Sequence, residues 1–156
     1  MKKIVAYTDV PTLIHHLKKE NRVLVGGCFD ILHLGHVRFL NSAKKHGVLI
    51  VALEDDNNLK AYKGVSRPIH RQNERAEVLS SLEAVDYVIL LPSFSTDAQY
   101  AHFTKLISPA TICVTAGDPQ LHNKAAQAKT VGATIITIPK IHTPSTSQLV
   151  KLLRLE

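Results

Sequence analysis

The chain alternates short runs of β-branched and aliphatic residues with longer segments whose apolar positions recur at helical spacing. Five runs predict strands: residues 23–28, 48–54, 87–91, 110–115 and 133–138. Four segments between them predict helices: residues 34–47, 70–85, 96–107 and 122–132. This alternation is typical of βαβ units with right-handed crossovers. We therefore predict an α/β fold, a Rossmann-like, doubly wound, five-stranded parallel sheet with helices on both faces.

The length of the chain bounds its organisation. With 156 residues, 45% of them hydrophobic, it suits one globular domain over residues 1–156. We expect a helical lead-in over residues 1–22 and a core over 23–156. No apolar run approaches the roughly 18 residues that would cross a bilayer. Asp9 and Pro11 interrupt the first segment before a signal-like stretch develops, so we expect a cytoplasmic protein without a membrane partner.

The two cysteines, Cys28 and Cys113, both lie in apolar, β-branched segments. This placement suits buried free thiols better than a disulfide framework or a four-ligand zinc site.

Positive charge is concentrated in one part of the chain. Of the formal net charge of +6, a net +4 lies between residues 57 and 75. This stretch contains the single acid Glu74 and five basic residues: Lys60, Lys63, Arg67, Arg71 and Arg75. A solvated surface would explain this stretch, and so would a nucleic acid, an acidic membrane or a small phosphate-rich substrate. The charge alone does not distinguish these explanations, so the neighbouring motifs are needed.

The segment GGCFDILHLGH, residues 26–36, places two histidines at the start of a predicted helix. His33 lies four residues before Val37 and His36 four before Leu40, so both imidazoles lie near the inward face of the first turn. Free backbone N–H groups and the helix dipole favour an anion there. Gly35 would allow a ligand to approach the backbone. Core histidines or half of a metal site are the alternatives, but no convincing further ligands accompany the pair.

The pattern FDxxHxGH after the first strand resembles the signature of the cytidylyltransferase-like nucleotidylyltransferases, members of the HxGH superfamily. The resemblance covers nearly the whole chain, in segments 27–47, 63–91, 116–118 and 144–153. The sequence is most similar to the adenylyltransferase domain of ADP-heptose synthase, an enzyme of lipopolysaccharide core synthesis. A short helical lead-in precedes the first strand in that domain as well.

The resemblance implies an enzyme that joins a nucleoside triphosphate to a small phosphorylated acceptor and releases pyrophosphate. ATP and a sugar 1-phosphate such as heptose 1-phosphate are the favoured pair. Mg²⁺ is expected through the triphosphate and not through a metal site of the protein. The resemblance also implies a homodimer and gives no reason to expect a nucleic acid partner.

The resemblance assigns catalytic roles to His33, His36, Lys63 and Arg75. The histidines would donate hydrogen bonds to the phosphates. Lys60 and Lys63 precede Gly64 in an expected loop after the second strand, which resembles the mobile segment that closes over phosphates in this family. Arg75 lies four residues before Leu79, on the inward face of its helix, and we expect it to point toward the nucleotide.

A larger set of residues is expected to bind the nucleotide: Gly27, Cys28, Phe29, Asp30, Gly35, Lys60, Gly117, Asp118, Ser145, Thr146 and Ser147. Asp30 would orient a histidine or an acceptor hydroxyl, or cap the first helix. Gly117 and Asp118 resemble a family turn near the base or ribose, although Gly-Asp is also an ordinary turn. The Ser-Thr-Ser segment suits an anion at a helix start, and simple capping explains one of its hydroxyls.

Departures from the family pattern keep other substrates open. Heptose-phosphate enzymes typically have lysine, glycine and an aromatic residue where this chain has Thr115, Ala116 and Pro119. Glycerol-3-phosphate cytidylyltransferases usually have arginine at the position of Lys140, and FAD synthetase is a further alternative. A catalytically weak nucleotide- or RNA-binding regulatory domain is the alternative of another class. An aromatic content of 5% offers few stacking platforms for RNA.

Overall fold

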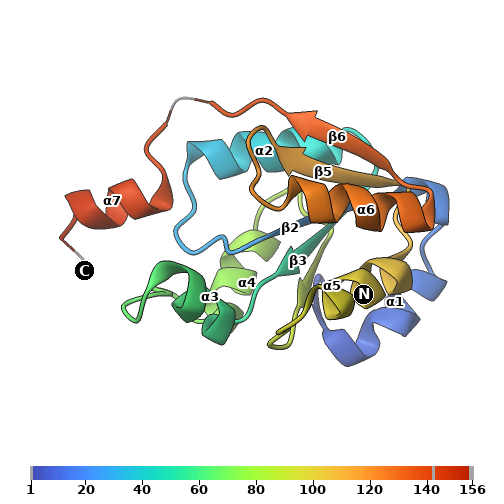
Figure 1. Cartoon of the computed structure of the whole chain (residues 1–156), viewed down its shortest axis with the longest axis horizontal. Coiled ribbons are helices and arrows are strands. Elements are labelled where there is room, and N and C mark those ends of the chain that lie inside the picture. Colours follow the sequence, from blue (N-terminus) through green and yellow to red (C-terminus); the bar gives the residue numbers. More distant parts are fainter. Residues whose placement is uncertain (1, 142, 155–156) are drawn as a thin grey trace.

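Six parallel strands form one sheet in the order β1-β4-β3-β2-β5-β6 in the computed structural model, which describes residues 2–141 and 143–154 (Figure 1). The strands are β1 (Ile4–Ala6), β2 (Arg22–Gly27), β3 (Val48–Leu53), β4 (Tyr87–Leu90), β5 (Thr111–Thr115) and β6 (Thr134–Ile138). Five of them confirm the predicted strands to within a residue or two at each end.

The predicted count of five strands was wrong because the lead-in is not purely helical. Its first residues form β1, which pairs with β4 so that Ile4 lies opposite Val88 and Ala6 opposite Leu90. The lead-in continues as η1 (Tyr7–Asp9), α1 (Val10–His15) and η2 (Lys19–Asn21). Three residues at the edge of a sheet are too few to show an alternating pattern, so a strand cannot be recognised there from periodicity.

Helices cover both faces of the sheet, as a doubly wound fold requires. The remaining helices are α2 (Leu34–Lys44), α3 (Asp56–Lys63), α4 (Gln72–Ser80), α5 (Asp97–Ile107), α6 (Leu121–Val131) and α7 (Thr146–Leu152). One core lies between the sheet and helices α2 and α4, and includes Leu40 and Leu79. The other lies beneath α1, α5 and α6, and includes Leu13 and Phe103.

The order of the strands fixes the position of the site. From β2 the chain proceeds outward through β3 and β4 on one side, and β5 and β6 lie on the other. The strand order therefore reverses between β2 and β5. Ligands bind at this point in folds of this kind. The loop that contains the histidine motif leaves the carboxyl end of β2 at this point.

Two further features follow from local sequence. Asp55 begins α3 because its carboxylate accepts hydrogen bonds from the N–H groups of Asn57 and Asn58, at 3.2 and 3.0 Å. The helix ends at Gly64, whose φ of 101° is unfavourable for a residue that has a side chain.

Within the described residues, no helix combines the length and apolar character that a bilayer span requires.

Candidate functional site

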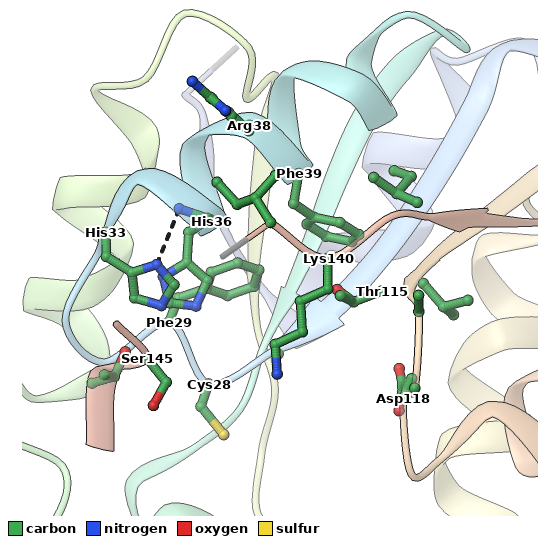
Figure 2. A pocket seen from close by; sticks show the side chains of 18 of the residues that line it. Cys28, Phe29, His33, His36, Arg38, Phe39, Thr115, Asp118, Lys140 and Ser145 are labelled. Atoms are coloured by element: carbon green, nitrogen blue, oxygen red, sulfur yellow. Dashed lines mark hydrogen bonds between the residues drawn. The ribbon is translucent and has the colours of Figure 1, made fainter. Parts of the chain in front are cut away.

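A pocket of about 860 Å³ opens at the carboxyl edge of the sheet, where the strand order reverses (Figure 2). Residues of the β2–α2 loop and the first turns of α2 form one wall, and the segments after β5 and β6 form the opposite wall. Leu59 and Lys63 of α3, Arg67 after it and the start of α7 also contribute to the lining. All of the predicted site residues line this pocket except Lys60 and Arg75.

The two histidine rings stack against each other at the start of α2. Their centroids are 3.9 Å apart and their planes are 29° from parallel. His33 is the N-cap residue, and its Nδ1 accepts a hydrogen bond from the N–H of Gly35 at 3.1 Å. Because Nδ1 is the acceptor, the neutral ring carries its proton on Nε2. Figure 2 shows a nitrogen of each ring facing the space near Cys28 and Ser145.

Both imidazoles are neutral at physiological pH. Burial lowers the pKa of His36 to about 4, with the neighbouring His33 as a second cause. Burial also lowers the pKa of His33. The Nδ1 atom of His36 is buried and has no hydrogen-bond partner among the described residues. The pair therefore offers N–H donors and no positive charge.

Gly35 lines the pocket and also makes room for neighbouring side chains. A Cβ atom at this position would lie 2.8 Å from Cε1 of His33 and 3.1 Å from Cγ2 of Thr143. The position that a Cβ would take is thus filled by the side chains of His33 and Thr143. The glycine is required because the His33 ring lies against its Cα.

Asp30 does not cap α2, whose N-cap is His33, and its carboxylate binds no histidine side chain among the described residues. Its buried carboxylate accepts hydrogen bonds from Nε of Arg67 at 2.6 Å and from the N–H groups of Ile69 and His70 at 2.9 and 3.1 Å. The ion pair with Arg67 is almost completely buried. Asp30 therefore holds the segment between α3 and α4 against the loop that carries the histidines.

Arg75 does not point toward the nucleotide pocket, which corrects the sequence expectation. Its side chain is fully buried and donates to the carbonyl oxygens of Cys28, Glu54 and His70 at 2.5, 2.8 and 3.0 Å. A fourth hydrogen bond, of 2.8 Å, joins it to Asp56. Carbonyl groups converge where strands β2 and β3 end, and the forked guanidinium satisfies them together. Its inward position was predicted correctly, but its partners were not.

The two lysines before Gly64 lie in the last turn of α3, not in a loop. The run DNNLKAYK contains one buried residue, Leu59, so it lacks the apolar periodicity that reveals a helix. Both lysines are exposed. Lys63 lines the pocket, whereas Lys60 does not. The structure therefore separates two residues that the sequence treated alike.

Two lysines that were absent from the predicted site line the opposite wall. Lys124 donates to the carboxylate of Asp118 at 2.7 Å, and Asp118 also accepts from the N–H of Gln120 at 2.8 Å. Lys140 has no ion-pair partner in residues 2–141 and 143–154, and its ammonium faces the pocket (Figure 2). It lies two residues beyond β6, so the carboxyl-edge rule would have found it. Gly117 adopts a φ of 78°, which suits the turn before Asp118.

The hydroxyl groups at the start of α7 mostly have partners within the chain. Ser145 is the N-cap and accepts from the N–H of Gln148 at 3.3 Å. Thr146 donates to the carbonyl oxygen of Ile31 at 2.8 Å, which ties α7 to the β2–α2 loop. Ser147 is exposed and lines the pocket.

Comparison with known proteins assigns this arrangement to a family. The profile of the cytidylyltransferase-like family matches residues 24–142, from within β2 to just beyond β6. The chain belongs to this family. It is thus a cytidylyltransferase-like protein of the nucleotidyltransferase type, and its histidine loop lies where the strand order reverses.

Relatives of this cytidylyltransferase-like chain include longer proteins. It is 39% identical over 150 residues to the bifunctional protein HldE of Helicobacter hepaticus, covering 96% of this chain and 30% of that protein. It is 46% identical over 106 residues to HldE of Aliarcobacter butzleri, covering 67% of this chain and 21% of that protein. The chain therefore spans less than a third of the length of these relatives.

Solved structures agree on the fold. The lipopolysaccharide core biosynthesis protein from Thermoplasma volcanium superimposes with a TM-score of 0.61 at 26% identity, covering 78% of this chain and 96% of that chain. The pantoate-beta-alanine ligase from Francisella tularensis has a TM-score of 0.67 at 17% identity, covering 92% of this chain and 69% of that chain. The second likeness concerns the fold alone. The homodimer and the cytoplasmic location stay predictions.

Proposed function

We propose that the chain transfers a nucleotidyl group, preferentially from ATP, to a small phosphorylated acceptor such as heptose 1-phosphate. The observation that carries this proposal is the neutral, stacked histidine pair at the start of α2, which faces a pocket with Lys63 and Lys140 in its lining. Donors at a helix start and free cations around one hollow suit a triphosphate.

In this reaction an oxygen of the acceptor phosphate attacks the α-phosphorus of the triphosphate. A new O–P bond forms, the bond to the β-phosphate oxygen breaks, and pyrophosphate leaves with the electron pair. Such a transfer requires little covalent work from the protein, because positioning and charge stabilisation supply most of the rate enhancement.

The residues divide this work between donors and charges. The Nε2–H groups of His33 and His36 donate hydrogen bonds to phosphate oxygens as negative charge shifts toward the pyrophosphate. Lys63 and Lys140, which both line the pocket, supply positive charge. Arg67 and Lys124 also line the pocket, but their charges are already paired with Asp30 and Asp118. The neutral histidines thus contribute directed donors, and the lysines contribute charge.

Mg²⁺ is expected to reach the site with the triphosphate. Phosphate oxygens and water are ligands that this ion prefers, and when bound it neutralises part of the triphosphate charge. In the described part of the chain, no group of three or more histidine, cysteine, aspartate or glutamate side chains is placed to hold a metal ion. We assign no residue of the chain as a ligand of this ion.

The proposed acceptor rests on similarity. The relatives named HldE and the resemblance to the adenylyltransferase domain of ADP-heptose synthase favour ATP and a heptose phosphate. A related structure described as a lipopolysaccharide core biosynthesis protein is consistent with this pathway. Thr115, Ala116 and Pro119 depart from the pattern of heptose-phosphate enzymes, so the acceptor needs a direct test.

The deciding experiment measures pyrophosphate release with each of the four nucleoside triphosphates and a panel of acceptors. The panel contains heptose 1-phosphate, other sugar 1-phosphates, glycerol 3-phosphate and FMN. We expect the fastest release with ATP and heptose 1-phosphate. Release only with CTP and glycerol 3-phosphate, or only with ATP and FMN, would reassign the substrate. Absence of release with every pair would favour a binding domain without transferase activity.

The variant His36→Ala tests the role of the histidine pair. Removing one such donor typically lowers the rate by about 100- to 1000-fold, so we expect near loss of pyrophosphate release with an unchanged circular dichroism spectrum. His102→Ala is the matched control, because His102 is exposed on α5 and does not line the pocket. Full activity of His36→Ala would remove the proposed mechanism.

A further inference from the structure

Phe29 lies directly behind the histidine pair. Its ring centroid is 5.2 Å from that of His36, and the two planes are tilted by 56°. Figure 2 shows the three rings in the order His33, His36, Phe29, so that the phenyl ring lies at the end away from His33. Only 5% of Phe29 is exposed, and it belongs to the core between the sheet and α2. Such a buried side chain offers little surface to a nucleotide, although the sequence placed it among the binding residues.

The backbone at Phe29 adopts an unfavourable conformation to place the ring there. Its φ is 44°, in the left-handed region that bulky L-residues rarely adopt. Residues in this region persist where the surrounding structure determines them and are concentrated at functional sites. We therefore explain the backbone conformation of Phe29 by the contacts that its ring makes.

Gly27 leaves room for the same ring. A Cβ atom on Gly27 would lie 2.9 Å from Cε2 of Phe29, closer than real Cβ contacts. On the other side of the stack, Gly35 leaves room for the ring of His33. The three rings are thus enclosed between two glycines, and neither glycine tolerates a side chain without displacing a ring.

Two buried arginines fix the residues on either side of Phe29. The carbonyl oxygen of Cys28 accepts a hydrogen bond from Arg75 at 2.5 Å. The carboxylate of Asp30 pairs with Arg67 at 2.6 Å. Both arginines are at most 3% exposed. The turn that carries Phe29 is therefore held from both ends by charged groups whose hydrogen bonds are made within the protein.

We propose that Phe29 is a positioning residue, whose ring holds the imidazole of His36 in the orientation that donates to the triphosphate and keeps water from its inner face. This inference rests on the proposed function for the donation step only. It also explains why two arginines are buried beside a phosphate site: they hold the turn that supports the donor. His33 is the titratable group that faces His36 within the stack.

The test compares Phe29→Ala with Phe103→Ala in the full chain. Phe103 is similarly buried, at 3% exposure, but it lies on α5 in the core on the opposite face of the sheet. Nuclear magnetic resonance titration of the imidazole ring protons reports the pKa of His36, which burial holds at about 4. We expect Phe29→Ala to raise this pKa toward 6.5, the ordinary value, and Phe103→Ala to leave it unchanged.

The kinetic readout separates positioning from general destabilisation. With Phe29→Ala we expect kcat to fall by about 10- to 100-fold, because the donor moves from its productive position. The KM for the nucleotide should change little, because the lysines and the backbone remain in place. Phe103→Ala should keep the kcat of the wild type at a temperature where both variants are folded.

Three outcomes would overturn the proposal: an unchanged pKa of His36 in Phe29→Ala, an unchanged kcat, or equal losses of kcat in the two variants. If Phe29→Ala does not fold, Phe29→Leu and Phe103→Leu provide the same comparison with smaller cavities. If the wild type transfers no nucleotidyl group to any acceptor, the proposed function fails, but the titration of His36 still decides whether Phe29 controls the environment of that ring.

Discussion

At the start of α2, two imidazole rings are in contact. If both were protonated, their positive charges would repel each other and oppose this contact. The neutral state follows from burial, and one proton position follows from the hydrogen bond that His33 accepts from Gly35. The spacing of the histidines in the sequence predicted their location at the start of a helix. It did not predict the stacking, because the conformation of Phe29 and the missing Cβ atoms of Gly27 and Gly35 depend on tertiary contacts.

The lowered pKa of His36 makes the stability of the fold depend on pH. Its pKa is about 4 in the folded chain and near 6.5 when unfolded, so the unfolded state binds more protons between these values. The free energy of unfolding should therefore decrease as the pH falls from 6.5 to 4. His36 accounts for at most about 3 kcal/mol of this decrease.

Urea denaturation of the wild type and His36→Gln at neutral pH and near pH 4.5 measures this contribution. The wild type should lose more stability than the variant, whose glutamine does not titrate. His102→Gln, at an exposed position, serves as the control and should behave like the wild type. Parallel losses in the wild type and His36→Gln would contradict the assigned pKa.

At the scale of elements, the site depends on where helices begin and end. The carboxyl-edge rule and the histidine motif correctly predict the start of α2, whereas the sequence pattern predicts a loop in place of α3. Its cap, Asp55, was readable in the sequence, but its polar composition concealed the helix. The same helix then decides which lysine reaches the pocket, because Lys63 is its last residue and lines the pocket, whereas Lys60 lies almost one turn earlier and does not.

Lys63 and Lys60 provide a test of this placement. Both are exposed in the last turn of α3, and Lys63 alone of the two lines the pocket. We expect Lys63→Ala to lower kcat/KM for the nucleotide by about 10-fold or more, equivalent to at least about 1.4 kcal/mol of transition-state stabilisation. Lys60→Ala should remain within about twofold of the wild type, as expected for a surface charge screened by solvent. Equal effects of the two variants would contradict the role of Lys63.

At the scale of the whole molecule, the alternation of strands and helices predicted most of the fold, including both helical layers. It missed β1 because a three-residue edge strand carries no periodicity, and it placed Arg75 in the pocket because an inward position does not identify a partner. Two of the carbonyl groups that bind Arg75, those of Cys28 and Glu54, come from strand ends that are distant from it in sequence. Such convergence is a property of the sheet topology and cannot be read from local spacing.

The distribution of charge over the molecule separates a nucleotide enzyme from an RNA-binding domain. Lys63 of α3 and Lys140 beyond β6 line one pocket, an arrangement that suits a compact triphosphate. A polymer would instead need a basic surface that follows its backbone, and its affinity would fall steeply with salt. The +6 charge of the chain is compatible with both, so stability in the presence of each ligand is the discriminating measurement.

We expect ATP with Mg²⁺ to raise the free energy of unfolding by about 2.7 kcal/mol at 100 times its dissociation constant, measured by urea denaturation. A single-stranded RNA of about 20 nucleotides should bind weakly at about 0.15 M salt and should not be displaced by ATP. The variant pair Lys63→Ala and Lys60→Ala then assigns the stabilisation to the pocket, because only the first should weaken it. Tight RNA binding with a steep salt dependence, together with no stabilisation by ATP, would favour the regulatory reading over the enzyme.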